Sequence, residues 1–357
     1  METQRDAFVE RLFGSILGMM DVLTIYVGDR LGLYRALQEG GAMTPPELAD
    51  VAGIQLRYSR EWLEQQAATA ILEVDDVSAD EDVRRYSLSE AHAHALIDPE
   101  SPYSMAPAAR SLVAVARATG PLLDAFRSGG GVTWEAYGRD MMEAQGDFNR
   151  PWLVSSFAKE YLPSIPGVHE SLMAGGARVA DVACGAGWAA IAIARAYPTA
   201  RVDGFDLDPS SIELAREHAE AAGVGDRVTF EVRDAGDPAL EGSYDLAVVV
   251  EAIHDLSRPV EVLDSIRRML KPGGLLVVAD ERTEDTFVAP AGDMERLFYG
   301  FSVLCCLPSA MDEQPSAATG TVMRRSTFER YALESGFSGV EVLEIEHDLL
   351  RFYLLRP

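Results

Sequence analysis

The chain has little cysteine: it has three among 357 residues, Cys184, Cys305 and Cys306. Two of them are adjacent, which is poor geometry for a disulfide framework, and neither cysteine nor histidine recurs at a spacing typical of a metal site. We therefore expect no disulfide framework, no bound metal and a reducing, cytoplasmic environment.

A basic patch and a long apolar run are also missing. The formal net charge is −26, with 31 Lys plus Arg against 57 Asp plus Glu, and such a surface repels phosphate backbones and anionic lipids. The first residues, METQRDAF, lack the basic start of a signal peptide, and no apolar stretch is long enough to span a bilayer. We expect neither nucleic-acid nor membrane binding.

The length predicts two domains, because 357 residues exceed the usual size of one hydrophobic core. Apolar residues recur at helical spacing between positions 7 and 38, which predicts a helix, a break and a second helix. The members of this stripe are Phe8, Leu12, Ile16, Met19, Met20, Leu23, Val27 and Leu31. Thr44 and Glu47 have the spacing of a capping box around two prolines, and a short helix should follow them.

A further helix is predicted over Ser59–Leu72. After it, residues 72–77 and 85–89 are typical of two short strands joined as a hairpin. Helices followed by a small hairpin predict a mainly helical winged-helix domain over residues 1–100.

Residues 101–165 are predicted to be a helical connector, with breaks at Pro121, Gly129–Gly131 and Pro151. From Ala177 onward, short apolar strands alternate with amphipathic helices, which predicts an α/β domain over residues 166–357 with a parallel sheet covered on both faces. The predicted strands are Val179–Ala183, Arg201–Asp206, Val228–Val232, Tyr244–Val250 and Leu275–Ala279. The last two, Val340–Glu346 and Arg351–Leu355, are too close together for a helical crossover and should pair antiparallel.

A glycine-rich turn follows the first strand of this domain. It runs from Asp181 through Gly185 and Gly187 into a helix, where glycine lets the backbone approach a ligand and the helix start offers unpaired N–H groups. The second strand ends at Asp206, whose carboxylate could accept hydrogen bonds from two ribose hydroxyls. This spacing predicts a nucleoside site.

Acidic residues also follow the third and fourth strands. Asp234 could accept the exocyclic amine of adenine, and Glu251 lies where a methionine ammonium group would bind. No basic residue lies at the glycine turn, so the set suits a cationic sulfonium nucleoside better than a pyrophosphate.

These motifs resemble those of the class I S-adenosylmethionine-dependent methyltransferases, over roughly residues 166–357. The resemblance implies a Rossmann-like seven-stranded methyltransferase sheet with an antiparallel terminal hairpin, and Leu270–Gly274 is a common signature before the fifth strand. This chain departs from the family pattern at Trp188, where a third glycine is often found. The implied residues of an S-adenosylmethionine site are Asp181, Gly185, Gly187, Asp206, Leu207, Asp234, Ala235 and Glu251.

The N-terminal part resembles the winged-helix domain of small-molecule O-methyltransferases, in residues 29–37, 44–49 and 85–89. That resemblance implies a homodimer formed through this domain and a small-molecule acceptor. A bacterial subgroup is similar in Phe148–Trp152, in Tyr161–Gly167 and in residues 314–321. Residues 1–100 contain eight Arg and no Lys against nineteen acidic residues, and the hairpin itself is acidic, so DNA binding is not expected.

His254 and Asp255 follow the fourth strand, where Rossmann-like folds place their chemistry. They are similar to the His-Asp pair that supplies the general base in plant-type O-methyltransferases. Asp255 or Glu281 would orient the imidazole. Alternatively, His254 caps a helix or lines the pocket.

The insertion over residues 281–325 is rich in apolar residues and would form either a substrate lid or packing between domains. Its candidate substrate contacts are Met294, Phe298, Tyr299 and Met323. Two other functions stay open, an NAD(P)-dependent oxidoreductase and a ligand-responsive winged-helix regulator without catalysis. The pattern does not name the methyl acceptor, nor does it distinguish O- from C- or N-methylation.

Overall fold

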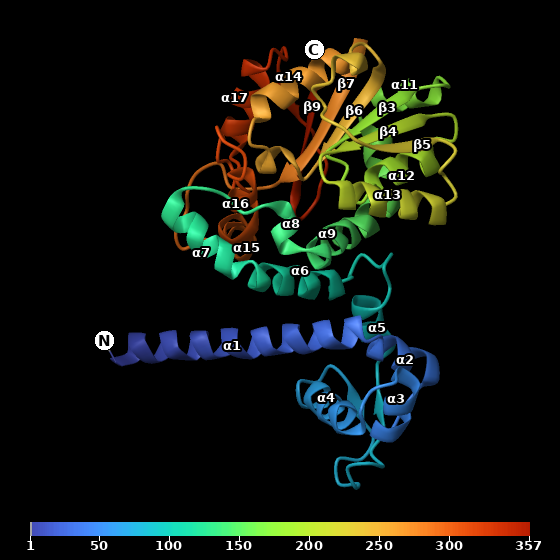
Figure 1. Cartoon of the computed structure of the whole chain (residues 1–357), viewed down its shortest axis with the longest axis vertical. Helices are drawn as coiled ribbons and strands as arrows, with labels where there is room; N and C mark the ends of the chain where they lie inside the picture. Colours follow the sequence, from blue (N-terminus) through green and yellow to red (C-terminus); the bar gives the residue numbers. More distant parts are fainter. Residues whose placement is uncertain (1) are drawn as a thin grey trace. The chain divides into compact units, whose positions relative to one another are not determined.

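A computed structural model describes residues 2–357 and divides the chain into two compact units, one ending at Val113 and the other spanning Ala114–Pro357 (Figure 1). The proposed domain limits at residues 100 and 165 stay predictions. Within the described residues, no helix is both long and apolar enough to cross a membrane.

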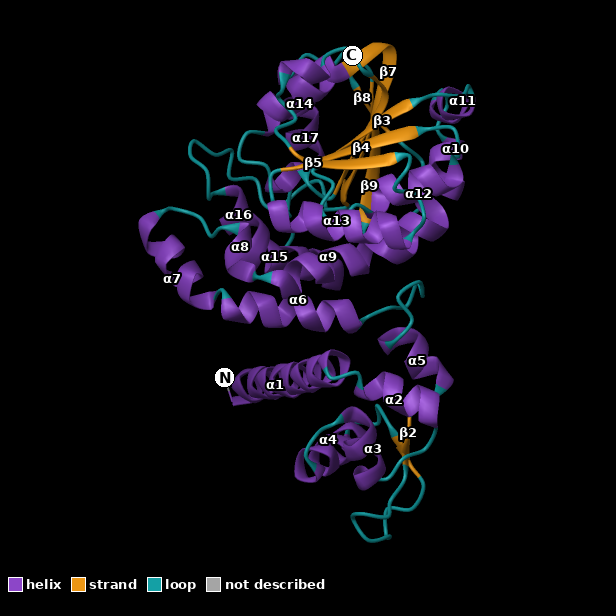
Figure 2. Cartoon of the chain, turned by 45° about the vertical axis from the view of Figure 1, so that its right-hand side comes forward, coloured by secondary structure: helices purple, strands orange, loops and turns teal. Residues whose placement is uncertain are grey.

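The N-terminal unit consists of helices and one small hairpin. Its complete elements are α1 (Glu2–Arg30), α2 (Leu33–Gly40), α3 (Pro45–Ala52), α4 (Leu56–Ala68), β1 (Glu73–Val74), β2 (Tyr86–Ser87) and α5 (Glu90–Leu96). The capping box is confirmed, because the Glu47 carboxylate accepts from the Thr44 N–H while the Thr44 hydroxyl accepts from the Glu47 N–H. Strands β1 and β2 pair antiparallel, so the predicted winged-helix elements are present (Figure 2).

The predicted helix over Ser59–Leu72 is wrong at both ends, since α4 runs from Leu56 to Ala68. Its end has a local cause: Ala70 has a φ of 58°, and the N–H groups of Ile71 and Leu72 turn back onto the carbonyl of Gln66. Leu72 is thereby buried beside the hairpin and does not extend the helix.

Helix α1 exposes a broad apolar face. Eight large apolar side chains in its first twenty residues are each about half exposed: Phe8, Val9, Leu12, Phe13, Ile16, Leu17, Met19 and Met20. At 100° per residue these positions cover about half of the helix circumference. A face of this kind marks a surface that is normally covered by another apolar surface.

The C-terminal unit contains the predicted seven-stranded sheet. Its order is β5-β4-β3-β6-β7-β9-β8, with parallel pairing from β5 to β7 and antiparallel pairing of β9 with both β7 and β8. The strands are β3 (Arg178–Val182), β4 (Arg201–Asp206), β5 (Val228–Val232), β6 (Tyr244–Val250), β7 (Leu270–Glu281), β8 (Val340–Val342) and β9 (Leu350–Leu355). The Rossmann-like sheet and its antiparallel terminal hairpin are thus confirmed.

Two predicted boundaries in this sheet need correction. The block Leu270–Gly274 lies inside β7 and not before it, with Leu270 already paired to Tyr244. The strand predicted over Val340–Glu346 ends at Val342, because β8 pairs with only the last three residues of β9.

Helices cover both faces of the sheet, with α12 and α13 on one side and α14 and α17 on the other (Figure 1). The helices and helical turns of this unit that follow α6 (Ala106–Arg117) are α7 (Thr119–Ser128), α8 (Trp134–Tyr137), α9 (Arg139–Trp152), η1 (Leu153–Tyr161), α10 (Leu162–Ser164), α11 (Val168–Met173), α12 (Trp188–Ala196), α13 (Pro209–Ala221), η2 (Pro238–Leu240), η3 (Ile253–Asp255), α14 (Pro259–Met269), α15 (Asp293–Phe301), η4 (Ser302–Cys306), α16 (Leu307–Ala310) and α17 (Arg325–Glu334).

The predicted break at Pro151 does not occur. The helix continues through Pro151 and changes at Leu153 from α geometry to a π-helical stretch that ends at Tyr161. Proline lacks an N–H donor and crowds the preceding turn, which favours altered hydrogen bonding at this point. Helices α9 and η1 therefore form one continuous helical segment that packs beside α12.

Candidate functional site

The glycine turn between β3 and α12 has left-handed backbone at three positions. Ala183, Gly185 and Gly187 have φ values of 56°, 49° and 79°. A Cβ at Gly187 would lie 2.5 Å from Cζ of Phe230, whereas a Cβ at Gly185 would meet nothing within 4 Å. Gly187 is therefore required by packing beneath the turn, and Gly185 leaves open space above it.

Asp181 supports this turn from inside the protein. It is 1% exposed, and its carboxylate accepts a hydrogen bond of 3.0 Å from the Ala190 N–H in the first turn of α12. Burial, with a smaller contribution from the charge of Asp206, raises the pKa of Asp181 to about 7. Its direct contact is with the helix start, so it can shape the site without touching a ligand.

Asp206, at the end of β4, is tied to the same turn. Its Oδ2 accepts from the Gly185 N–H and its Oδ1 from the Asp208 N–H, both at 2.9 Å. A carboxylate has about four lone-pair sites, so two remain for ligand hydroxyls. The neighbouring Leu207 is 64% exposed and offers an apolar contact next to the carboxylate.

Asp234 and Ala235 follow β5 at the same edge of the sheet. The exposed Asp234 carboxylate accepts from the Gly236 N–H at 2.7 Å, which fixes a local turn, and Ala235 packs against the core on the α14 face. Asp234 and Ala235, the predicted adenine contacts, therefore lie next to Asp206, the predicted ribose ligand, since β4 and β5 are adjacent and parallel.

Glu251 directly follows β6 and has a left-handed φ of 49°. Its Oε2 accepts two hydrogen bonds of 2.8 Å, from the side-chain amides of Gln145 and Asn149 on α9. Burial raises the pKa of the Glu251 carboxyl, although the two amides and His254 oppose this shift.

His254 is 2% exposed and surrounded by acids. Nδ1 lies 2.8 Å from Oδ1 of Asp280 and 2.9 Å from Oε2 of Glu281, while Nε2 lies 3.3 Å from Oδ1 of Asp255. Burial alone would lower the pKa of His254, but the combined charges of Asp255, Glu281 and Asp280 outweigh it and raise the pKa well above its usual range.

The pKa values of the three carboxyl groups shift in different directions. Burial raises the pKa values of Asp255 and Glu281, whereas the charge of His254 and its hydrogen bond more than offset burial at Asp280 and lower the pKa of that carboxyl. Asp280 is therefore the ionised partner that holds Nδ1–H. Nε2, which lies 3.3 Å from Asp255, is the ring nitrogen that can exchange a proton with a ligand.

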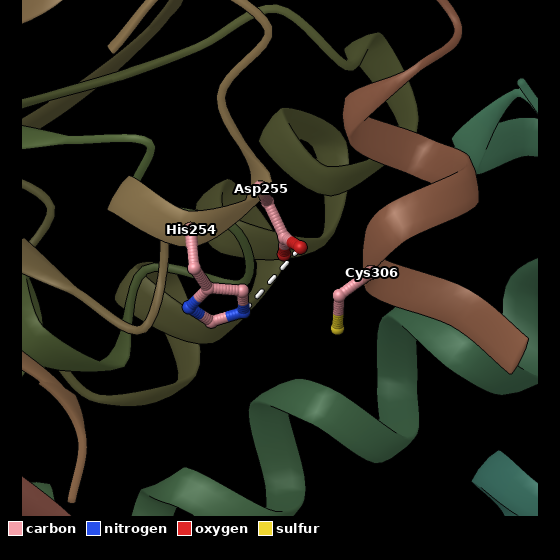
Figure 3. A group of neighbouring side chains, drawn as sticks. All are labelled: His254, Asp255 and Cys306. Atoms are coloured by element: carbon pink, nitrogen blue, oxygen red, sulfur yellow. Dashed lines mark ion pairs between the residues drawn. The ribbon is translucent and has the colours of Figure 1, made fainter. Parts of the chain in front are cut away.

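The other side of the imidazole faces the insertion. Figure 3 shows His254 and Asp255 on one segment and Cys306 on a helical turn opposite, with Nε2 directed between Asp255 and Cys306. Contact with Cys305 and burial raise the pKa of the Cys306 thiol well above its usual range, so it is a neutral group in this site.

Two overlapping groups in the described residues could hold a metal ion by the spacing of their ligand atoms. They are His254 with Asp255 and Cys306, and His254 with Asp280 and Glu281, each set lying within 4.8 Å. The sequence predicts no metal here, and that stays a prediction.

The four candidate substrate contacts do not share one surface. Phe298 and Met323 are buried, Tyr299 is half-buried, and Met294 is exposed. Met323 packs in the core on the α14 face, whereas the Tyr299 hydroxyl accepts a hydrogen bond of 2.9 Å from Arg324. The insertion contacts His254 through Glu281 at Nδ1, through the Gly320 N–H, which donates to the His254 carbonyl at 3.0 Å, and through Cys306.

Sequence reasoning missed Asp280, Cys306, Gln145 and Asn149 as site residues. Asp280 precedes the predicted Glu281 and was detectable as the second acid at the end of its strand. Asn149 lies in the Phe148–Trp152 motif, but nothing in that motif alone indicates which side chain it contacts.

Comparison with known protein families matches two parts of the chain. Residues 174–317 match the family described as "Methyltransferase domain", and residues 19–97 match the Rv2258c-like winged HTH domain. Among curated relatives, 27-O-demethylrifamycin SV methyltransferase of Amycolatopsis mediterranei is 35% identical over 106 residues, which are 29% of this chain and 39% of the relative. Methyltransferase GfsG of Streptomyces halstedii is 34% identical over 106 residues, 29% of this chain and 38% of the relative. The chain thus spans under two fifths of the length of each.

Solved structures extend the likeness in fold to the whole chain. The mitomycin 7-O-methyltransferase MmcR has a TM-score of 0.72 at 22% identity and covers 100% of both chains. Human N-acetylserotonin methyltransferase, solved in complex with SAM, has a TM-score of 0.72 at 19% identity and covers 98% of this chain and 97% of its own. At these identities the likeness shows the fold alone. The chain therefore contains one part that matches a methyltransferase domain and another that matches a winged helix–turn–helix domain, and it has the fold of these solved methyltransferases over its whole length.

Proposed function

We propose that this protein transfers the methyl group of S-adenosylmethionine to a hydroxyl group of a small molecule, with His254 as the general base. The observation that carries the proposal is the arrangement of the imidazole. Asp280 holds Nδ1 at 2.8 Å, while Nε2 faces the segment that carries Cys306, at the carboxyl edge of the sheet.

The acidic residues around the glycine turn support the cofactor assignment. Asp206, Asp234 and Glu251 lie at or just after the ends of three strands of one sheet, and the backbone above Gly185 is open. In this proposal Asp206 accepts the ribose hydroxyls, Asp234 and Ala235 contact the adenine, and Glu251 binds the methionine ammonium group. When bound, the cofactor supplies an electrophilic methyl group on a sulfonium.

His254 then removes one proton from the acceptor. As the acceptor oxygen attacks the methyl carbon, its hydroxyl proton passes to Nε2 and the carbon–sulfur bond breaks. Asp280 keeps the imidazole in the tautomer with the proton on Nδ1 and stabilises the imidazolium that forms. The three neighbouring carboxyl groups make this histidine a stronger base than a free imidazole.

The apolar face of α1 supports a homodimer formed through the N-terminal unit. The hairpin region supports a domain that does not bind DNA, because arginines beside it are already paired with acids inside the unit. Arg60 on α4 forms ion pairs with Glu81 and Asp82, and Arg84 pairs with Glu64 on α4.

The proposal is tested by measuring thermal unfolding with S-adenosylhomocysteine and, in parallel, with NADH. Stabilisation by S-adenosylhomocysteine alone is expected, and stabilisation by NADH alone would favour an oxidoreductase. Methyl transfer is then assayed with isotopically labelled S-adenosylmethionine and a panel of phenols, aliphatic alcohols and amines. Binding of the cofactor with no transfer to any member of the panel would favour the ligand-responsive regulator.

A further inference from the structure

Glu251 is held in an unusual backbone conformation. Its φ of 49° is left-handed, which a residue with a β-carbon rarely adopts, and its N–H donates to the Ala279 carbonyl of β7 at 2.7 Å. The neighbouring strand therefore fixes the backbone at this point, and the side chain is directed away from the strand to α9.

Two amides of α9 bind the same oxygen of this side chain. Gln145 and Asn149 are one helical turn apart on one face of α9, and both donate to Oε2 at 2.8 Å. Among residues 2–357, no side chain donates a hydrogen bond to Oε1 of Glu251. The arrangement occupies one carboxylate oxygen and leaves the other for a further donor.

The inner amide is itself held in place. Asn149 is 7% exposed, and its Oδ1 accepts a hydrogen bond of 2.8 Å from the Trp152 indole. With its oxygen occupied, the amide must present its NH₂ group to Glu251. Gln145, by contrast, is exposed, so the outer amide can be changed without opening the core.

Helix α9 also touches the glycine turn. Gly146, next to Gln145, is so close that a Cβ there would lie 2.5 Å from Cβ of Ala186, between Gly185 and Gly187. Arg150 lies 4.3 Å above the ring of Trp188, the residue that replaces the third glycine of the turn. Helix α9 therefore contacts both the glycine turn and Glu251. In the proposed function, the turn and Glu251 both lie at the methionine moiety of the cofactor.

We propose that Gln145 and Asn149 are positioning residues that orient Glu251, so that its free oxygen binds the methionine ammonium group of the cofactor. This inference rests on the proposed function. It gives a role to the Phe148–Trp152 motif: Asn149 orients the acid, Trp152 holds Asn149, and Arg150 packs on the glycine turn.

The test compares two ligands that differ in the group concerned. S-adenosylhomocysteine carries the ammonium group, whereas 5′-methylthioadenosine has the same adenosine and sulfur without the amino acid. Calorimetry on the full chain should show that Gln145→Ala and Asn149→Ala each weaken S-adenosylhomocysteine binding about tenfold. Their affinity for 5′-methylthioadenosine should change by less than about twofold. Gln38→Ala, which removes an exposed amide on α2, is the matched control.

The possible outcomes distinguish a failure of this inference from a failure of the proposed function on which it rests. Equal weakening of both ligands would mean that α9 only supports the fold, and would overturn the inference while the cofactor assignment stands. Wild-type protein that binds 5′-methylthioadenosine as tightly as S-adenosylhomocysteine would overturn it as well, because no ammonium subsite would exist. Wild-type protein that binds neither ligand would overturn the proposed function itself. If Asn149→Ala fails to fold, the exposed Gln145→Ala still decides the question.

Discussion

The Gly185 N–H donates to Oδ2 of Asp206 at 2.9 Å, so the end of β4 is tied to the glycine turn that follows β3. The same carboxylate is the candidate ligand for ribose hydroxyls. Cofactor binding and the shape of the turn therefore depend on one side chain.

Asp206→Ala should weaken S-adenosylhomocysteine binding at least tenfold, because charge-assisted hydrogen bonds are worth about 1.5–3 kcal/mol each. Isothermal titration calorimetry measures the change, with Asp226→Ala, an exposed acid, as the control. Unchanged affinity in a folded variant would remove Asp206 from the site.

His254→Asn should lower turnover by about a hundred- to ten-thousandfold while leaving S-adenosylhomocysteine affinity nearly intact. Asparagine keeps some hydrogen bonding but cannot take the proton. Steady-state kinetics with an identified acceptor check this. Retention of more than about a third of wild-type turnover would mean that proximity alone drives transfer, or that the acceptor needs no base here.

The turnover of wild-type enzyme should rise with pH above neutrality. Only the deprotonated imidazole can accept the hydroxyl proton, and the surrounding carboxyl groups raise the pKa of His254 well above 6.5, so the ascending limb moves to higher pH. A kcat–pH profile measures this limb, and His254→Asn should lack it. A wild-type profile that is already flat between pH 6 and 9 would contradict the base assignment.

Asp181→Asn should flatten the pH dependence of folding stability between about pH 4 and pH 7. The folded carboxyl has a pKa of about 7 and the ordinary pKa of an aspartate is 3.8, so in this window only the folded state binds the proton. Stability therefore falls as pH rises, by about 1.4 kcal/mol per pH unit for one such group. Urea unfolding of wild type and variant across this range gives the difference, and parallel curves would show that Asp181 does not titrate there.

The apolar face of α1 predicts a homodimer. Deleting residues 1–38 should yield monomers or aggregate, and Phe13→Glu with Leu17→Glu should disrupt the dimer with little loss of fold, since both side chains are exposed. Multi-angle light scattering gives the mass. An intact protein that is monomeric at micromolar concentration would show the dimer proposal to be wrong.

Local pattern predicted the sheet well, because strands such as Tyr244–Val250 are short, mainly apolar runs and the last two strands cannot be joined by a crossover. It also predicted Asp206, which is the last residue of a strand. Of the partners of His254, Asp255 and Glu281 were named from the sequence, whereas Asp280 and Cys306 were not. Asp280 comes from a strand 26 residues later, and Cys306 comes from the insertion, so their approach depends on how β7 and η4 pack.

The ring of Phe230 lies beneath two glycines from different parts of the chain. A Cβ at Gly204 would lie 2.4 Å from it, and a Cβ at Gly187 would lie 2.5 Å from it. Gly187 also has a φ of 79°, so its identity is fixed by the backbone as well as by the ring, whereas Gly204 is fixed by its side-chain neighbours, chiefly the ring and also Sγ of Cys184 at 3.0 Å. Among relatives of this chain, alanine at position 204 should therefore occur together with a smaller residue at position 230, while glycine at position 187 should persist whichever residue occupies position 230.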